Sequence, residues 1–337
     1  MATERERFFD EMNGKWDGIV RSGVGITYPV WKEYGERLAW MEGFSPYVSV
    51  GISRQSGRPP GHEVTDMWGC RWRYPIESLD GIVIEHPLAS WDALRTWRPP
   101  RPEDHADWKK VEEDFRRRRA EGRLSSNGTE HGFLFLRLTY LRGYENLMVD
   151  VAEGRPELDQ LIAIIEGYWT DVIRRYIDLG LDFYSFGDDL GLQDRLPIRP
   201  AAWRRYIKPT YSRLFGLCES HGIPTYLHTD GYVVDIIPDL IECGLSILNV
   251  QELVNGLDTI ARLAKGKVAI DMDIDRQHVT VFGTPEEVDA HIERCIRTLG
   301  SSDRRLTTIW GVYPHTPYEN IEACVRALDR CATMWKR

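Results

Sequence analysis

The stretch Tyr-Leu-His-Thr-Asp-Gly at 226–231 contains the residue types best suited to chemistry. It ends a short apolar run, and a helix-like segment at 233–243 follows. Side chains alternate along a strand with a period of two, so His228 and Asp230 point the same way. An imidazole beside a carboxylate suits acid–base catalysis or metal binding. If this strand belongs to a parallel barrel, the pair faces the end where such barrels do chemistry.

Polar side chains also mark the ends of the other predicted strands. These ends carry Asp66, Arg142 with Glu145, Asp188 with Asp189, His228 with Asp230, Gln251 with Glu252, Asp273 with Asp275, and Tyr313 with His315. One polar end is ordinary, because loops are polar, but a polar end on every strand indicates a common rim. Barrel active sites are assembled from several strand ends. We therefore predict that the active site lies on this rim.

Several of these residues also have a structural interpretation. Asp188 and Asp189 suit either capping of the next segment or binding of a cation or amine. His228 could be a hydrogen-bonded residue of the core or a functional residue. The neighbouring Asp230 favours the functional interpretation. Together with the distant Glu252, the pair is compatible with Zn²⁺, which accepts imidazole and carboxylate ligands. The spacing alone does not specify the metal.

Strand-like and helix-like segments alternate from about residue 130 onward. The predicted strands are 133–139, 183–186, 224–227, 245–250, 268–271 and 306–310. The predicted helices are 157–179, 201–221, 233–243, 258–263, 285–299 (with Thr284 as N-cap) and 318–335. Short connections between strand and helix predict a parallel sheet with right-handed crossovers. One or two further units before residue 130 bring the count close to the eight of a closed barrel.

The predicted fold class is therefore α/β, a (β/α)8 TIM-type barrel. An open doubly wound sheet is the alternative, but no GxGxxG follows the first strand. Before residue 130, segments 8–14, 28–42 and 108–121 are helix-like, and segment 62–74 is typical of a strand or hairpin. No repeat or low-complexity linker divides the chain. We expect residues 1–337 to form a single barrel domain, with 1–60 as an N-terminal helical elaboration.

Composition limits the classes of function. The 337 residues are 42% hydrophobic, enough for a full core, and the formal net charge of -9 argues against nucleic acid or anionic membranes as partners. No stretch approaches the length of a transmembrane helix, and the N-terminus lacks the apolar region of a secretory signal. The six cysteines form no CxxC pair, so reduced thiols are expected. These features favour a cytoplasmic protein.

Several sequence blocks carry a family resemblance over roughly residues 60–335. They include DMWGC at 66–70, RGYENLM at 142–148, GDDLG at 187–191, HGIPTYLHTDG at 221–231 and GVYPHTPYEN at 311–320. In this order the blocks resemble the uroporphyrinogen decarboxylase superfamily. That superfamily includes cobalamin-dependent methyltransferases, which move methyl groups between corrinoids and thiols. The resemblance implies a (β/α)8 barrel with its site at the C-terminal rim.

The resemblance to the decarboxylases is incomplete near the N-terminus. True uroporphyrinogen decarboxylases carry a PVWxMRQAGR signature whose arginines bind substrate carboxylates. The nearest match here is PVWKEYGER at 29–37, where Tyr34 takes the first arginine position and Arg37 is out of register. The family's catalytic Asp and Tyr would correspond to Asp66 and Tyr140. Decarboxylation of a true porphyrinogen is therefore not expected.

The resemblance to the methyltransferases is also partial. That branch uses a zinc site of the form His-x-Cys plus a later Cys. Here His228 is retained, Asp230 takes the first Cys position and Trp310 takes the second. The resemblance implies a variant metal site of His228, Asp230 and Glu252. Harder ligands favour polarising an ether or hydroxyl oxygen over activating a thiol.

The first hypothesis is a corrinoid-linked methyltransferase acting on a small methylated substrate. Its expected cofactors are Zn²⁺ and methylcobalamin on a partner carrier protein, and family analogy implies a homodimer. The predicted catalytic residues are His228, Asp188, Asp189, Tyr140 and Asp66. The predicted substrate-binding residues are Arg142, Gln251, Arg276, Tyr313 and His315. Tyr140 or Tyr313 would donate a hydroxyl proton.

Two alternatives remain open. The first is a metal-free decarboxylase or lyase-like enzyme acting on a smaller acid. There Asp66 would stabilise developing positive charge, and Arg71, Arg142 or Arg276 would hold a carboxylate. The second is a non-catalytic barrel that binds a small molecule, which the loss of family ligands favours.

Overall fold

A computed structural model describes residues 2–301 and 304–336 of the chain. The chain divides into two compact units. Unit 1 comprises Met1–Phe9, Glu63–Trp72 and Val83–Ile247, and unit 2 comprises Asp10–His62, Arg73–Ile82 and Leu248–Arg337.

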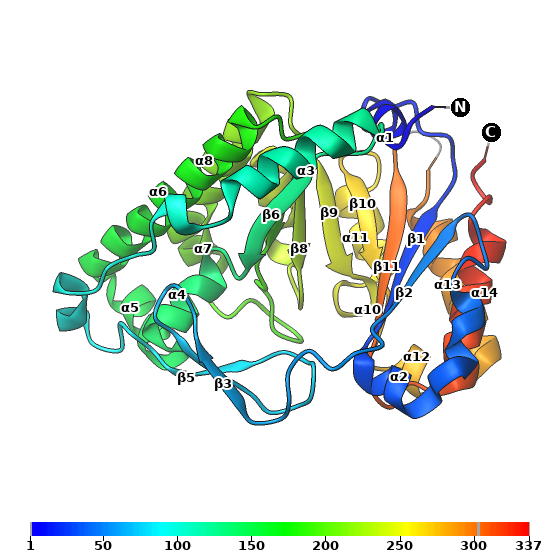
Figure 1. Cartoon of the computed structure of the whole chain (residues 1–337), viewed down its shortest axis with the longest axis horizontal. Helices are drawn as coiled ribbons and strands as arrows, with labels where there is room; N and C mark the ends of the chain where they lie inside the picture. The colour runs from blue at the N-terminus through cyan, green and yellow to red at the C-terminus, as the bar shows by residue number, and fades with distance from the viewer. Residues whose placement is uncertain (1, 302–303, 337) are drawn as a thin grey trace. The chain divides into compact units, whose positions relative to one another are not determined.

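Eight strands form the main parallel sheet, in the order β2-β1-β11-β10-β9-β8-β7-β6 (Figure 1). Unit 1 contains β6 (Ser126–His131), β7 (Phe183–Gly187) and β8 (Thr225–Thr229). Unit 2 contains β1 (Arg21–Ile26), β2 (Val48–Ile52), β10 (Ala269–Asp273), β11 (Leu306–Val312) and all but the first residue of β9 (Ile247–Gln251). This order follows the sequence cyclically, as expected for consecutive strand–helix units. The predicted α/β class with eight parallel strands is confirmed.

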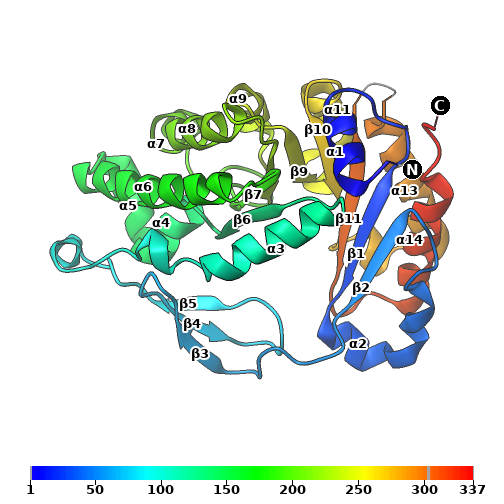
Figure 2. The ribbon, with the colours of Figure 1, turned by 45° about the horizontal axis from the view of Figure 1, so that its top comes forward.

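Aromatic side chains fill the core of unit 1. Its helices are η2 (Trp91–Arg95), η3 (Pro102–Asp104), α3 (Trp108–Ala120), α4 (Phe135–Arg142), α5 (Tyr144–Glu153), α6 (Pro156–Asp178), α7 (Pro200–Tyr206), α8 (Lys208–Glu219), η4 (Val234–Ile236) and α9 (Ile237–Glu242). Side chains alternate in burial along β7, so Tyr184 and Phe186 face inward. Tyr176 of α6 packs on Phe115 of α3 and on Tyr184, and α3 and α6 run beside β6 and β7 (Figure 2). This packing fixes the strands that carry the candidate site.

Unit 2 packs amphipathic helices on its strands. Its helices are α2 (Tyr28–Tyr34), η1 (Gly35–Met41), α10 (Glu252–Asn255), α11 (Leu257–Ala264), α12 (Val279–Phe282), α13 (Pro285–Leu299) and α14 (Tyr318–Cys331), while α1 (Glu4–Met12) has residues in both units. Strand β1 pairs in parallel with both β2 and β11. The predicted N-cap of α13 is confirmed, because Thr284 and Glu287 form a complete capping box.

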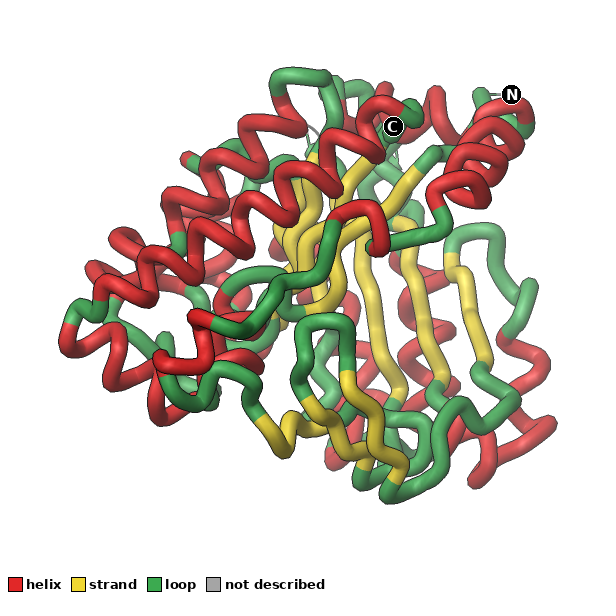
Figure 3. Tube along the Cα trace, turned by 60° about the vertical axis from the view of Figure 1, so that its left-hand side comes forward, coloured by secondary structure: helices red, strands yellow, loops and turns green. Residues whose placement is uncertain are grey.

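A separate three-stranded sheet has the order β3-β4-β5, and its strands are among those drawn in yellow in Figure 3. Its strands are β3 (His62–Thr65), β4 (Arg71–Tyr74) and β5 (Ile82–Glu85). The prediction of a strand or hairpin at 62–74 is thus confirmed. Within residues 2–301 and 304–336, no helix combines the length and apolar character needed to cross a membrane.

Three predictions about elements were wrong in detail. Segment 133–139 is helical, since α4 covers Phe135–Arg142, and the strand of this unit is β6, which ends at His131. A short apolar run cannot be assigned to strand or buried helix by periodicity alone. The helix expected at 201–221 is two helices, α7 and α8. Segment 1–60 contains strands β1 and β2 of the main sheet as well as helices.

Candidate active site

The C-terminal ends of β6, β7 and β8 bring two histidines and two aspartates together in unit 1. The strand register pairs Gly187 with His131 on one side and with His228 on the other. Asp188 and Asp189 directly follow Gly187, and Asp230 follows β8. Because the three strands are parallel, their carboxyl ends lie at the same edge. The predicted polar strand ends are therefore found for Asp188, Asp189, His228 and Asp230, whereas Arg142 and Glu145 lie on helices α4 and α5.

Asp189 lies between the two imidazoles. Its Oδ1 is 3.2 Å from His131 Nε2 and 3.8 Å from His228 Nε2. His228 Nε2 also lies 3.7 Å from Asp230 Oδ1. One ligand atom each from His131, Asp189 and His228 all lie within 4.8 Å of one another. The cluster is thus compact enough to surround a single cation.

The charges in this cluster stabilise one another. The hydrogen bond with Asp189, together with the nearby carboxylates, raises the pKa of His131 above its ordinary value, although burial opposes this. Burial opposes ionisation of Asp189, but the hydrogen bond with His131 and the charges of both histidines hold its pKa below the usual range. An ionised carboxylate held between two imidazoles suits a divalent cation or a mobile proton.

Asp188 faces the interior. Its carboxylate accepts hydrogen bonds from the backbone N–H groups of Phe135 and Leu136, at 2.7 and 2.8 Å, and from the Tyr211 hydroxyl at 3.0 Å. It is fully buried, and burial raises its pKa to about 6 although the hydrogen bonds oppose this. Asp188 therefore caps the start of α4, which precedes it in the chain, whereas the sequence suggested capping of the segment that follows. Within the pair, Asp189 alone contacts the histidines.

Two glycines allow the loops after β7 and β8 to touch. Gly231 has a φ of +82°, and a Cβ atom there would lie 2.3 Å from the carbonyl oxygen of Gly191. The N–H of Gly191 donates to the carbonyl of Asp230 at 3.2 Å, and the N–H of Asp230 donates to the Asp189 carboxylate at 3.1 Å. Only a residue without a side chain fits this approach. The contact holds Asp189 and Asp230 beside each other.

Asp66 is engaged in an internal network. Its carboxylate accepts hydrogen bonds from the backbone N–H groups of Trp68 and Cys70, from Trp72 Nε1 and from Arg137 Nη1, all within 3.0 Å. Arg137 is 2% exposed, so this ion pair is largely buried. The predicted catalytic Asp66 thus also organises the turn before β4.

Arg142 and Tyr140 lie on α4. The Arg142 guanidinium donates to the Asp150 carboxylate at 2.7 Å and to the backbone carbonyl of Leu88, and it lies 3.9 Å from the centre of the Trp91 ring. Arg142 is 4% exposed, so this ion pair is buried. The Tyr140 ring packs edge-on against the Trp72 ring, with 4.7 Å between the two ring centres.

The remaining predicted substrate-binding residues lie in unit 2. Arg276 donates to the Asp273 carboxylate at 3.0 Å and lies 5.6 Å from the centre of the Tyr313 ring. Gln251 is the buried last residue of β9, and His315 is exposed with a φ of +76°. Within unit 2, the structure therefore brings Arg276 and Tyr313 together after β10 and β11.

Glu252, the third predicted metal ligand, is also in unit 2. Its buried carboxylate lies 2.6 Å from His291 Nε2 and accepts hydrogen bonds from the backbone N–H groups of Asp275 and Leu253. The other two predicted ligands, His228 and Asp230, lie in unit 1, where His131 and Asp189 accompany them.

The sequence argument missed His131. The polar end of the first strand was sought after residue 139, because the strand was placed at 133–139 (see Overall fold). The structure ends β6 at His131, directly before Gly132, whose φ is +78°. Gly132 was the available signal in the sequence, because a glycine often marks a turn at the end of a strand and would have placed His131 at a strand end.

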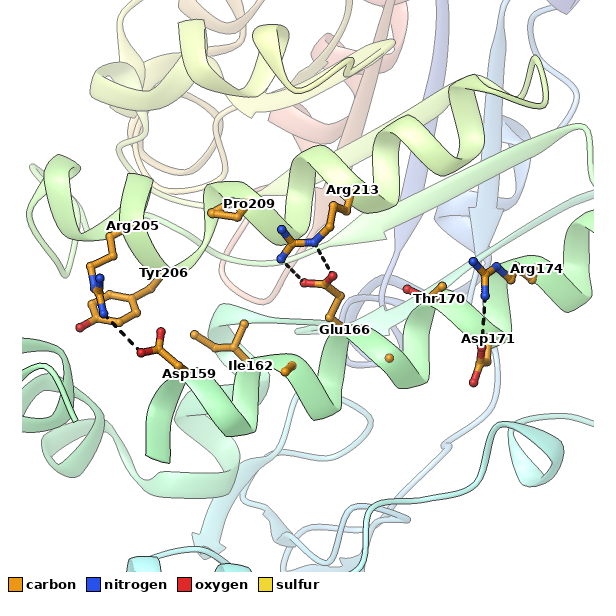
Figure 4. A pocket seen from close by; sticks show the side chains of 12 residues that line it. Asp159, Ile162, Glu166, Thr170, Asp171, Arg174, Arg205, Tyr206, Pro209 and Arg213 are labelled. Carbon is orange, nitrogen blue, oxygen red and sulfur yellow. Dashed lines mark hydrogen bonds and ion pairs between the residues drawn. The ribbon is translucent and has the colours of Figure 1, made fainter. Parts of the chain in front are cut away.

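A groove among three helices of unit 1 is a further concave surface (Figure 4). It has a volume of about 430 Å³ and is lined by residues of α6, α7 and α8. Its charged side chains pair with each other, as in Arg213 with Glu166 and Arg205 with Asp159. None of its lining residues comes from a strand end, so it contributes nothing to the histidine–aspartate cluster.

Comparison with known sequences identifies one family. The uroporphyrinogen decarboxylase (URO-D) family matches residues 66–331. A curated uroporphyrinogen decarboxylase from Synechococcus sp. (strain CC9605) is 27% identical over 172 residues. That match covers 50% of this chain and 46% of the relative, so it spans less than half of the relative's length.

Comparison with solved structures identifies a shared fold. A methyltransferase from Methanosarcina mazei superposes with a TM-score of 0.64 at 17% identity, covering 98% of this chain and 99% of that one. A B12-independent methionine synthase from Shewanella sp. W3-18-1 gives a TM-score of 0.45 at 11% identity, covering 68% and 66%. The first comparison shows the same fold over the whole chain, and the second is too distant to bear on function.

Proposed function

Because the chain belongs to the uroporphyrinogen decarboxylase family, we propose that it is a corrinoid-linked methyltransferase acting on a small methylated substrate. The observation that carries this proposal is the cluster of His131, Asp189 and His228 at the ends of β6, β7 and β8. The proposal includes closure of the eight-stranded sheet into a TIM-type barrel, whose C-terminal rim is the usual place for such a site. The fold shared with the M. mazei methyltransferase is compatible with methyl transfer.

The donor atoms of the cluster fit a divalent cation of the zinc type. Two imidazole nitrogens and a carboxylate oxygen form a common set of three protein ligands, and Asp230 provides a fourth donor nearby. A metal held by His131, Asp189 and His228 would supply Lewis acidity toward an ether or hydroxyl oxygen. The absence of sulfur from this set favours oxygen substrates over thiols.

The surrounding residues position the cluster and the substrate. Asp188 anchors the start of α4, which carries Tyr140, the proposed donor of a hydroxyl proton. Asp189 holds both imidazoles toward one point, and the Gly191–Gly231 contact keeps Asp230 beside it. Methylcobalamin on a separate carrier protein is the proposed methyl acceptor or donor. The substrate-binding roles of Gln251, Arg276, Tyr313 and His315 belong to this proposal.

A decarboxylase of a smaller acid is the second candidate, favoured by the similarity to a curated uroporphyrinogen decarboxylase. That reaction needs a cation to hold the substrate carboxylate. Arg71 is engaged by Glu63 and Glu85, Arg142 by Asp150, and Arg276 by Asp273. A substrate carboxylate would compete with these carboxylates for the arginines, which supports methyl transfer over decarboxylation.

Metal content tests the proposal first. We expect the His228→Ala variant to hold about one equivalent less zinc per chain than the wild type, because it loses one of three ligands. His221→Ala is the matched control, since His221 is exposed and outside the cluster, and its metal content should equal that of the wild type. Equal metal content in the wild type and His228→Ala after zinc supply would contradict the proposed site.

Activity separates the two candidates. A methyltransferase of this type should change the absorbance of methylcobalamin when enzyme and methyl acceptor are mixed, and a chelator should abolish the change. Release of CO₂ from a carboxylic acid, undiminished by chelator, would instead establish the decarboxylase.

A further inference from the structure

Unit 2 contains a second group of ligand-type side chains, outside the proposed catalytic cluster. His291 and Cys295 are four residues apart on α13, so they lie on the same face of that helix. Glu252 directly follows β9 and begins α10. Glu252 and Cys295 are buried, and His291 has 13% of its side chain exposed.

The three side chains converge on one point. His291 Nε2 is 2.6 Å from Glu252 Oε1 and 3.5 Å from Cys295 Sγ. One ligand atom from each of the three residues lies within 4.8 Å of the others. In a nucleophilic triad, the imidazole uses its two different nitrogens for the nucleophile and the acid. Here both partners approach the same nitrogen, which is the arrangement of ligands around a cation.

The histidine–cysteine distance matches a tetrahedral zinc site, and the histidine–glutamate distance is shorter than such a site requires. Bonds of about 2.0–2.1 Å to nitrogen and 2.3 Å to sulfur place those two ligand atoms about 3.6 Å apart. The observed separation between His291 Nε2 and Cys295 Sγ is 3.5 Å. The Glu252 oxygen would have to move from 2.6 Å to about 3.3 Å from His291 Nε2 to reach its place.

The carboxylate of Glu252 is already oriented by the backbone. Its Oε1 accepts a hydrogen bond from the N–H of Asp275 at 3.0 Å, and its Oε2 accepts one from the N–H of Leu253 at 2.7 Å. Metal-binding carboxylates are typically fixed by such outer hydrogen bonds. The cluster therefore has both converging donors and backbone support for the carboxylate of Glu252.

A pocket opens onto this cluster. It has a volume of about 470 Å³, and Glu252 and His291 line it together with Leu253, Val279 and Arg294. Cys295 is not among the lining residues, so the pocket reaches the cluster from the side of Glu252 and His291. Three protein ligands with one open position distinguish reactive zinc sites from closed structural ones.

We propose that Glu252, His291 and Cys295 form a second site for a divalent cation of the zinc type, with its fourth position open to the pocket. When the metal binds, the Cys295 S–H bond breaks, its proton passes to solvent, and a sulfur–metal bond forms. This site goes beyond the proposed methyltransferase function. Its thiolate ligand makes it softer than the histidine–aspartate cluster of unit 1.

Cobalt(II) titration of the metal-free, full-length protein tests this site. Co²⁺ bound to a thiolate gives a sulfur-to-metal charge-transfer band in the near ultraviolet, whereas the unit 1 cluster contains no sulfur. We expect the band to correspond to one bound Co²⁺ per chain and to be complete by about two added equivalents, because the unit 1 cluster also binds metal, with release of at least one proton. Cys295→Ser and His291→Gln should each remove the band, and His228→Ala should retain it.

Cys218→Ser is the matched control, because Cys218 is a buried thiol outside both clusters, and this variant should keep the full band. Circular dichroism verifies the folding of each variant. If Cys295→Ser does not fold, the test of the site depends on His291→Gln, because the His291 side chain is partly exposed. A folded wild type without a charge-transfer band, or a band retained in Cys295→Ser or His291→Gln, would overturn the proposal. Because His228→Ala metal content is measured separately, failure of this site is distinguishable from failure of the proposed function.

Discussion

Asp189 is the residue on which the chemistry of the unit 1 cluster depends. It contacts both imidazoles, while its neighbour Asp188 is committed to α4. The sequence placed Asp188, Asp189, His228 and Asp230 at strand ends, and the structure places them there. It could not find His131, because that required the true end of β6. It also could not tell which of the two adjacent aspartates faces inward, since that depends on the loop after β7.

Replacing Asp189 with Asn should lower the pKa of His131. The carboxylate raises the pKa of this imidazole through a hydrogen bond and its charge, and an amide provides no negative charge. The titration of His131 followed by NMR in metal-free protein measures the shift. Asp194→Asn is the control, because Asp194 is exposed and pairs with Arg195 away from the cluster. An unchanged pKa in Asp189→Asn would show that the contact is absent in solution.

Arg142 should behave as a structural residue in addition to any contact with substrate. Arg142→Ala leaves Asp150 buried without its cation, which typically costs about 3–5 kcal/mol of the free energy of unfolding. Urea denaturation measures this loss. Arg174→Ala is a suitable comparison, because its pair with Asp171 is exposed and should contribute less than about 0.5 kcal/mol. Equal stabilities of the two variants would refute the buried ion pair.

At the scale of elements, periodicity found the strands and helices that are strongly apolar on one side. The helix predicted at 285–299 matches α13, and the strands predicted near 183, 224 and 306 match β7, β8 and β11. Strand β1, with the sequence RSGVGI, was not located, because two glycines weaken the strand signal. Segment 133–139 was misassigned, and Asp188, which accepts hydrogen bonds from the first amides of α4, comes from a distant part of the sequence.

The contact between the loops after β7 and β8 predicts a large effect of Gly231→Ala. A Cβ atom at this position would lie 2.3 Å from the Gly191 carbonyl oxygen, in addition to the strain of a φ of +82°. We expect a lower melting temperature and weaker metal binding. Gly222→Ala is the control for φ alone, because Gly222 has a φ of +69° and no atom within 4 Å of the added Cβ. Similar effects of both variants would mean that the loop contact contributes nothing.

At the scale of the whole molecule, the sequence predicted the α/β fold class but not the division of the chain into two compact units. The described residues form two compact units, and the boundaries fall inside α1, inside the small sheet and at β9. No composition change marks these boundaries, because both units are built from the same strand–helix pattern. The single barrel domain over 1–337 and the homodimer therefore remain predictions.

The stability that His105 contributes should fall as the pH drops below the ordinary pKa of histidine, about 6.5. Burial lowers the pKa of His105, which lies among aromatic rings of α3 and α6. The unfolded chain therefore takes up this proton at a higher pH than the folded chain. This contribution is complete above the unfolded pKa of His105 and is lost as the pH falls through it toward the lower folded value.

Urea unfolding at pH 8, 7, 6 and 5 measures this dependence, and His105→Gln should reduce its slope. His221→Gln should leave the slope unchanged, because His221 is exposed. If the free energy of unfolding of His105→Gln depends on pH as steeply as that of the wild type, the pH dependence comes from groups other than His105.

The adjacent aspartates after β7 couple the cluster to the start of a helix through a single peptide unit. Asp188 accepts hydrogen bonds from the amides of Phe135 and Leu136, while Asp189 contacts the histidines. A cation or substrate that pulls on Asp189 must therefore alter how tightly those two amides are held. Their rates of hydrogen exchange give a spectroscopic reporter of occupancy that needs neither a known substrate nor an assay of turnover.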